Sequence, residues 1–430
     1  MKKTRLALAI AATAMASTPV LATNGDNLIG LGAQSRALGG TGTAAFFGSE
    51  NALTNPALLG KSQGTEFAIG GTLFKPNVKA ETNVASMNYP AAVSQTSDND
   101  TNIIPEVSLS TRINNNWTFG LGIFGSAGMG TDYRDNGGAP DGTGLFNGYS
   151  NLQLMKFAPT IAYNSNKFGI GFAPVIQYGA LDINYQSMDM GTGNVSNVGN
   201  GMSTDIGYGY NLGGYFDITS DLTIALAYQS AIDMKYKDQI TDAADGFGIG
   251  PNGMQTITSN HLEQPAEIKA GIAYTMGSFM LTADAKQIKW GDAKGYKDFN
   301  WKDQNVFGVG AKYTGNRYWL GIGYNYGEDP IDKRGDSSNP MQTYSNQAVN
   351  LFNNQFFPAI VESHFTFGGG YSLTKHIALD GAIVYAPEVS KKIDTTAISS
   401  MMSGGMNTNP TYQEVKHSQI GYTLSLRMNF

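Results

Sequence analysis

The last eleven residues constrain the fold of this chain most strongly, because apolar and polar side chains alternate there without a break. Side chains of a β-strand point to opposite faces in turn, so a period of two predicts a strand with one apolar face and one polar face that contacts water. Similar runs recur at residues 117–123, 222–228 and 279–286. The chain is therefore expected to be all-β. The apolar positions of the last run are Ile420, Tyr422, Leu424, Leu426, Met428 and Phe430.

Two classes of polar connection separate these runs. Single-chain outer-membrane barrels have an even number of strands, short turns on one side and long loops on the other. A soluble β-sandwich would also alternate, but its turns would not sort into two length classes. The pattern predicts a transmembrane antiparallel β-barrel of about fourteen strands. Short turns fall near residues 114–116, 164–166, 219–221, 276–278, 314–316 and 374–376, and longer loops near 77–102, 129–149, 186–203, 237–262, 291–302, 328–360 and 391–411.

The composition agrees with a barrel and excludes several other classes. The chain has 54 glycines, 22 tyrosines and 21 phenylalanines, and charged residues make up only 14% of it. Its mean hydropathy of −0.22 is compatible with a membrane barrel, because lipid-facing apolar residues alternate with lumen-facing polar ones. The net charge of −6 gives no indication of the basic surface that nucleic-acid binding requires. Without cysteine, disulfide scaffolds, thiol nucleophiles and zinc–thiolate sites are excluded.

The first 22 residues have the three parts of a secretory signal peptide. Lys2, Lys3 and Arg5 precede a short apolar run, and residues 20–22 form a small-residue cleavage site that makes Thr23 the expected mature N-terminus. The alternative is a retained anchor, but the apolar run is too short to span a bilayer as a helix. We expect export to the outer membrane of a Gram-negative bacterium. Expected partners there are outer-membrane lipid, lipopolysaccharide and the barrel-assembly machinery, whose recognition signal the terminal aromatic strand resembles.

Residues 23–61 do not alternate, and they are rich in glycine and alanine. Such a segment can pack densely in a confined space and follow an irregular path there. A flexible periplasmic tail is the alternative, but a solvated tail would not need apolar anchors such as Leu28, Phe46 and Leu58. We therefore predict three parts: a signal peptide (1–22), an N-terminal hatch that plugs the lumen (23–61) and the transmembrane barrel (62–430).

The hatch also carries a specific resemblance. Residues 30–37 (GLGAQSRA), 40–44 (GTGTA) and 55–58 (NPAL) resemble the N-terminal hatch of the long-chain fatty-acid and aromatic-hydrocarbon transporters of the FadL/TodX family. The similarity continues at residues 262–267 (LEQPAE) and 358–364, and it covers essentially the whole mature chain. It implies an outer-membrane transporter for hydrophobic molecules: fatty acids, alkanes or aromatic hydrocarbons.

The resemblance further implies a route. Extracellular loops capture the substrate, which passes through a pocket between hatch and barrel and leaves sideways where the third strand is kinked. Re-entering water would cost an acyl chain of about fifteen CH₂ groups roughly 12 kcal/mol, so a lateral exit is physically sensible. The expected kink is Gly125, Ser126, Ala127 and Gly128, where alternation fails, although these glycines could merely end the strand. By analogy, Asn55, Pro56 and Ala57 of the hatch would brace this opening.

Apolar residues in the third, fourth and sixth loops are candidates for substrate capture, because exposed apolar side chains in long loops suggest a binding surface. The alternative is that they pack the loops together as a cap over the barrel. The family's larger helical insertions have no counterpart here, which leaves the entry site open. The candidates are Met188, Met190, Phe247, Met254, Leu351, Phe352, Phe356 and Phe357.

Two other functions remain alternatives. A general hydrophilic porin would carry a constriction lined by opposed charges, whereas this chain has few charges and a small-residue plug. An outer-membrane hydrolase would need a nucleophile, a base and an orienting group, and no such set is identifiable. The four histidines are scattered, without metal-ligand spacing. We expect no enzyme activity, no cofactor and no metal.

Overall fold

The computed structural model describes residues 23–83, 92–134, 146–188, 194–405 and 409–430. Within them, eighteen strands form one sheet, of which β1, β2, β4 and β9 are short strands outside the barrel wall. The other fourteen are antiparallel neighbours, and β18 pairs with β3 to close the barrel. This confirms the predicted fourteen-stranded barrel. The wall strands are β3 (Thr65–Thr82), β5 (Asn102–Arg112), β6 (Trp117–Met129), β7 (Tyr149–Asn164), β8 (Phe168–Met188), β10 (Ser203–Asp217), β11 (Leu222–Gln229), β12 (Glu267–Met276), β13 (Phe279–Ile288), β14 (Gln304–Thr314), β15 (Tyr318–Gly327), β16 (Ser363–Ser372), β17 (Ile377–Asp394) and β18 (Tyr412–Asn429).

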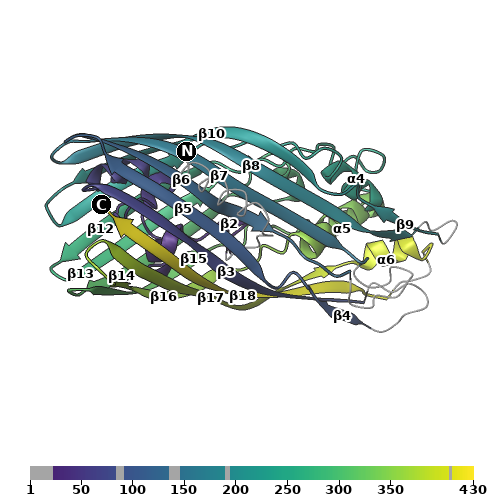
Figure 1. Ribbon diagram of the computed structural model, residues 1–430. Helices are drawn as coiled ribbons and strands as arrows, with labels where there is room; N and C mark the ends of the chain where they lie inside the picture. The colour runs from purple at the N-terminus through teal and green to yellow at the C-terminus, as the bar shows by residue number, and fades with distance from the viewer. Residues whose placement is uncertain (1–22, 84–91, 135–145, 189–193, 406–408) are drawn as a thin grey trace.

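The connections sort into two lengths, one at each end of the barrel (Figure 1). Short turns join β5 to β6, β7 to β8 and the later pairs, and long loops lie at the opposite end, which is the extracellular end by the rule for such barrels. Three of these loops are named L4 (230–266), L5 (289–303) and L6 (328–362). The loops carry β4 (Val93–Thr96), β9 (Val195–Val198), α4 (Ile240–Gly246), η2 (Tyr296–Phe299), α5 (Pro340–Phe356) and α6 (Thr396–Met402).

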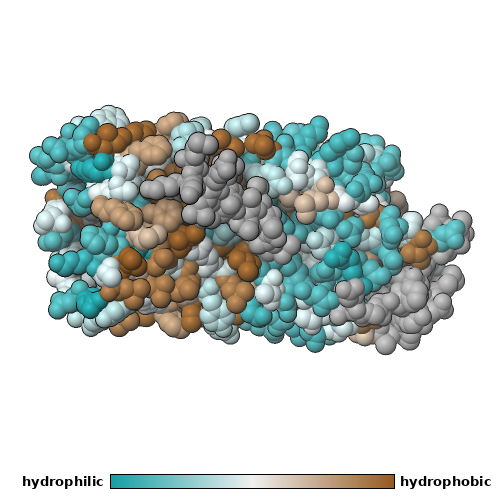
Figure 2. Space-filling model, in the orientation of Figure 1, coloured by the Kyte–Doolittle hydropathy of each residue, from teal (hydrophilic) through white to brown (hydrophobic). Residues whose placement is uncertain are grey.

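The alternation seen in the sequence turns apolar side chains outward. On β18, Tyr422 and Leu424 are exposed while Thr423 and Ser425 are buried against the lumen. Apolar residues gather in a band over the strands toward the short-turn end, with hydrophilic residues at both ends of the molecule (Figure 2). A band of this kind faces the hydrocarbon core of a membrane. None of the helices in the described ranges is long and apolar enough to cross a membrane.

Residues 23–61 lie inside the barrel, and nearly all of them are buried. Their elements contact the inner wall on several sides, with α2 against β16 and β17 and η1 against β7, β8 and β10. Arg36 forms a buried ion pair with Glu106 of β5 at 2.5 Å and also donates to Thr72 of β3. This segment is the hatch, and it fills the lumen as predicted. Its elements are β1 (Thr23–Asn24), β2 (Asn27–Leu28), α2 (Gly32–Ala37), α3 (Asn51–Thr54) and η1 (Pro56–Lys61).

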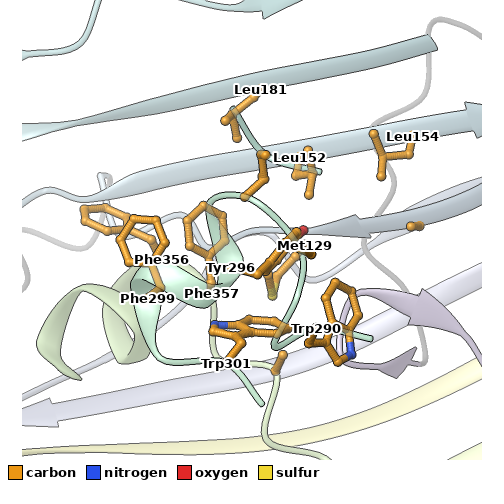
Figure 3. Close-up of a cluster of buried hydrophobic side chains, with 14 of the residues drawn as sticks. Met129, Leu152, Leu154, Leu181, Trp290, Tyr296, Phe299, Trp301, Phe356 and Phe357 are labelled. Carbon is orange, nitrogen blue, oxygen red and sulfur yellow. The ribbon is translucent and has the colours of Figure 1, made fainter. Parts of the chain in front are cut away.

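The extracellular loops pack over the hatch and share one hydrophobic cluster with it. Phe299 of L5 stacks on Phe352 of α5 with ring centroids 4.9 Å apart, and Phe352 in turn contacts Phe356. In Figure 3 the rings of Phe299, Phe356, Trp290, Tyr296 and Trp301 lie close to aliphatic side chains of the inner wall. Burial of so many aromatic rings stabilises the loops in one arrangement. We call this assembly the cap.

Candidate functional site

The third wall strand, β6, is irregular where it meets the hatch. Its register against β7 shifts between Gly125 and Ala127, which is a β-bulge. The alternation of buried and exposed side chains stops at the same place, and every residue from Phe124 to Met129 is buried. The bulge lies within the stretch where the sequence loses its alternation.

The first described residues of the hatch cover this bulge from inside. Residues 23–28, here the N-terminal hairpin, consist of β1, a two-residue turn and β2. Asn27 forms an antiparallel bridge with Ala127, and the backbone N–H of Gly128 donates to the backbone carbonyl of Asp26 at 3.1 Å. The hairpin therefore continues the hydrogen bonding of the wall at the point where the wall is irregular.

Side chains from L4 and L5 hold the tip of the N-terminal hairpin. The Asp26 carboxylate accepts hydrogen bonds from the Tyr296 hydroxyl and, at 3.0 Å, from the Gln264 amide. Gly25 has a φ of +69°, and a Cβ there would lie 2.5 Å from the Trp290 ring, so only glycine fits. Burial raises the pKa of Asp26 to about 6, although the hydrogen bonds from Tyr296 and Gln264 lower it.

A small pocket lies behind the hairpin, between hatch and wall. Its volume of about 70 Å³ is room for a few water molecules. One part of its lining is apolar and the other is polar and charged, and Ser126 of the bulge also lines it. The apolar residues include Leu28, Ile29, Leu31, Leu53 and Val306, and the polar ones include Lys156, Gln229, Glu267, Lys269, Asp284 and Lys286.

The charges of the pocket are only partly paired. Lys269 forms an ion pair with Glu267 at 2.9 Å, and the Asp284 carboxylate accepts from two backbone N–H groups of the hatch. Lys156 is 2% exposed and forms no hydrogen bond or ion pair among the described residues, and the carboxylates of Glu267 and Asp26 are its electrostatic neighbours. The side-chain nitrogen of Gln229 is likewise buried without a partner among the described residues. Such donors suit an anionic group of a ligand.

The Asn55-Pro56-Ala57 motif lies elsewhere in the lumen. Asn55 caps η1 by accepting from the Ala57 N–H at 3.1 Å, and its side chain also donates to the Thr43 carbonyl. The motif packs against Gly171 of β8 and Gly213 of β10, where a Cβ would collide with it. The motif thus contacts β8 and β10, which follow the bulged strand β6 along the chain. The hatch residues that contact the bulge itself are Asp26 and Asn27, whose position the motif analogy did not indicate.

The candidate capture residues that the structure describes are mostly in the interior of the cap. Phe247, Leu351, Phe352, Phe356 and Phe357 are at most 8% exposed, and Met254 is half-buried. Their contacts are those of a packed cap, the second interpretation of the sequence pattern. The side chain of Met188 and the whole of Met190 lie outside the described residues.

Several residues of the site were not singled out from the sequence. Lys156 and Lys286 line the pocket, whereas Arg36 and Arg112 bind hatch or wall groups. Asp26, Tyr296 and Lys269 belong to no recognisable sequence motif. The polar face of the run at residues 279–286 was a signal for Asp284 and Lys286, because inward positions of a barrel strand alternate with lipid-facing ones.

A closed fourteen-stranded barrel with an apolar outer band and a lumen filled by its own N-terminal segment defines a plugged outer-membrane transport protein. The comparison with protein families agrees. The chain belongs to the outer membrane protein transport protein family (OMPP1/FadL/TodX), whose model matches residues 7–342. It is therefore an outer-membrane transporter for hydrophobic substrates.

Individual relatives are distant in sequence. The long-chain fatty acid transport protein of Escherichia coli O6:H1 is 25% identical over 352 residues, which are 70% of this chain and 76% of that protein. The crystal structure of the Pseudomonas putida toluene transporter TodX matches with a TM-score of 0.65 at 19% identity, over 95% of this chain and 100% of that one. A FadL homologue of Pseudomonas aeruginosa matches with a TM-score of 0.68 at 14% identity, over 94% and 100% of the two chains. These two structures establish the fold.

Proposed function

We propose that this protein imports amphiphiles with an anionic head group and a long apolar chain, of which long-chain fatty acids are the simplest. The observation that carries the proposal is the pocket between hatch and wall, which is lined by apolar residues and by Lys156, a buried residue that forms no hydrogen bond or ion pair among the described residues. A neutral hydrocarbon would leave that ammonium group without a partner, and an unpaired buried charge is costly. A carboxylate would supply the missing acceptor.

Substrate entry requires the hatch or the cap to move. A pocket of about 70 Å³ is too small for a long acyl chain, so the described conformation is a closed one. The apolar rings of the cap belong to the extracellular loops and would meet the substrate first when the loops separate. In this role Phe247, Met254, Leu351, Phe352, Phe356 and Phe357 act as capture residues only in an opened cap.

The exit we propose is lateral, at the bulge of β6. Ser126 lines the pocket and also belongs to the bulge, so the path from pocket to wall is short. Leaving through the wall keeps the acyl chain in apolar surroundings, because each CH₂ returned to water costs about 0.8 kcal/mol. Lipid and lipopolysaccharide would surround the outer band, and the exposed Phe430 would be read by the barrel-assembly machinery.

A disulfide lock tests the route. Asn27 and Ala127 are directly opposed, and the flanking hydrogen bond from Gly128 to Asp26 makes them a closely spaced pair. The Asn27→Cys/Ala127→Cys variant introduces two cysteines into a chain that has none. Oxidation should abolish oleate uptake by cells that lack other transporters, and reduction should restore it.

The single-cysteine variants Asn27→Cys and Ala127→Cys are the controls, and oxidant should leave their uptake unchanged. Oleate uptake by the fully oxidised double variant at the rate of its reduced form would refute the lateral route.

A further inference from the structure

The N-terminal hairpin is held from two directions. Its β2 side is bonded to the bulge of β6, through the Asn27–Ala127 bridge and the Gly128–Asp26 hydrogen bond. Its tip is held by extracellular loops, through Tyr296 and Gln264 on the Asp26 side chain. A single residue, Asp26, takes part in both attachments, with its backbone carbonyl toward the wall and its carboxylate toward the loops.

The loop side of this attachment is closely packed. Trp290, Tyr296 and Trp301 pack on one another with ring centroids 4.6 to 5.0 Å apart, and all three are at most 3% exposed (Figure 3). Trp290 covers Gly25 and donates to Gln304 at the start of β14. Trp301 donates to Asn353 of α5, so L5 is tied to the cap. A displacement of the cap would therefore reach the hairpin tip through these rings.

We propose that Asp26 is a latch residue: its hydrogen bonds to Tyr296 and Gln264 hold the N-terminal hairpin closed over the β6 bulge, so that movement of L5 opens the bulge. Asp26 is a positioning residue here, since it acts on the wall through the hairpin and not on the substrate. The inference rests on the proposed lateral route, and it adds which contact keeps that route shut and which loop releases it.

The charge of Asp26 sets the strength of the latch. The ionisable groups that face it are Tyr296 of L5, Tyr236 of L4, Lys156 of β7 and Glu267 of β12. Burial, the largest effect, raises the pKa of Asp26 to about 6 in the closed hairpin, whereas a solvated carboxyl in an open hairpin would have its ordinary value of 3.8.

The closed state consequently binds the proton more tightly than the open one. Closure is strongest when the pH is below the pKa of Asp26 in the open hairpin. It weakens as the pH rises from about 4 to about 6, and it does not change further above pH 6. Between pH 5 and pH 7.5 the ratio of open to closed hairpin should rise about tenfold.

Cysteine labelling reads the state of the hairpin directly, because the chain contains no other cysteine. Ser126→Cys places a thiol at the bulge, in the buried lining of the pocket. The rate at which a water-soluble maleimide modifies it in the folded protein, reconstituted in liposomes, reports opening of the hairpin. Ser108→Cys is the matched control, since Ser108 is also buried and contacts another part of the hatch, at Ser49.

Two isosteric substitutions should act in opposite directions. Tyr296→Phe removes a donor to a buried carboxylate and should speed labelling of Ser126→Cys about tenfold at pH 7.5, without changing Ser108→Cys. Asp26→Asn imitates the protonated carboxyl, so it should slow labelling and remove its pH dependence relative to the parent. Because thiol reactivity itself depends on pH, each rate is compared with the rate of the Ser108→Cys control at the same pH.

Equal acceleration by both substitutions, or a parallel rise at Ser108→Cys, would mean general loosening of the hatch and would overturn the latch. So would unchanged labelling in Tyr296→Phe and Asp26→Asn proteins that remain folded by heat modifiability on gels. If one variant does not fold, the pH dependence of the Ser126→Cys parent and the other variant still decide. Labelling is independent of oleate uptake, so failure of the latch is distinguishable from failure of the transport route.

Discussion

Arg36 of the hatch and Glu106 of β5 form an ion pair of 2.5 Å whose two side chains are 2% and 4% exposed. Arg36 also donates to Thr72 and Thr423, on the two strands where the barrel closes. One guanidinium group thus ties the plug to three wall strands. Its planar set of donors can bond to all of these partners at once, which a lysine could not do.

Removing one partner of this pair should loosen the hatch. Arg36→Met leaves Glu106 buried and unpaired, which should lower the free energy of unfolding by about 3 to 5 kcal/mol. Bilayer conductance should rise as the hatch leaves the lumen. The double variant Arg36→Met/Glu106→Gln should be less destabilised than the sum of the single variants. An intact protein that already conducts like an open pore would instead favour the hydrophilic porin.

The pocket lysines should select for the head group. Lys156→Met and Lys286→Met should reduce uptake of oleate about tenfold, because each removes a charge-assisted bond to the carboxylate, while uptake of methyl oleate changes little. Lys312→Met is the matched control, since Lys312 is a lumen lysine that bonds to Gln34 outside the pocket. Equal losses for acid and ester would contradict an anionic head group. Uptake is measured with labelled substrates.

Close packing of hatch against wall should make one wall glycine irreplaceable. A Cβ on Gly171 would lie 2.3 Å from the Ala57 nitrogen, so Gly171→Ala should destabilise the protein by about 1 to 3 kcal/mol. Gly214 is a matched position on β10, where a Cβ would have nothing nearer than 3.8 Å. Thermal unfolding of Gly214→Ala should follow the parent. A Gly171→Ala protein as stable as Gly214→Ala would show that the hatch yields easily.

The cap should depend on its central ring. Phe352 is fully buried and contacts Phe247, Phe299 and Phe356, so Phe352→Ala should cost about 3 to 5 kcal/mol and loosen the loops. Proteolysis of the extracellular loops should become faster. Met341→Ala, at an exposed position of the same helix, should leave proteolysis unchanged. Protection of the Phe352→Ala loops at the parent's level would argue against a packed cap.

The barrel was determined by the sequence itself. A period of two is a local property, and the run that ends at Phe430 identifies its lipid face without any distant contact. The two lengths of connection then gave the strand number, because each reversal is also encoded locally by its polar residues. The hatch followed from residues 23–61, whose small side chains suit a confined lumen.

Which residues meet at the site was decided by the tertiary structure. Asp26, Ala127, Gln264 and Tyr296 come from four separate parts of the chain, and nothing in their local sequence indicates that they meet. The candidate capture residues could not be placed for the same reason, since the sequence of an apolar loop does not show whether its side chains pack against a neighbour or face solvent. Which side chains share a pocket depends on how barrel closure and hatch path bring distant segments together, and this long-range geometry has no periodic signal in the sequence.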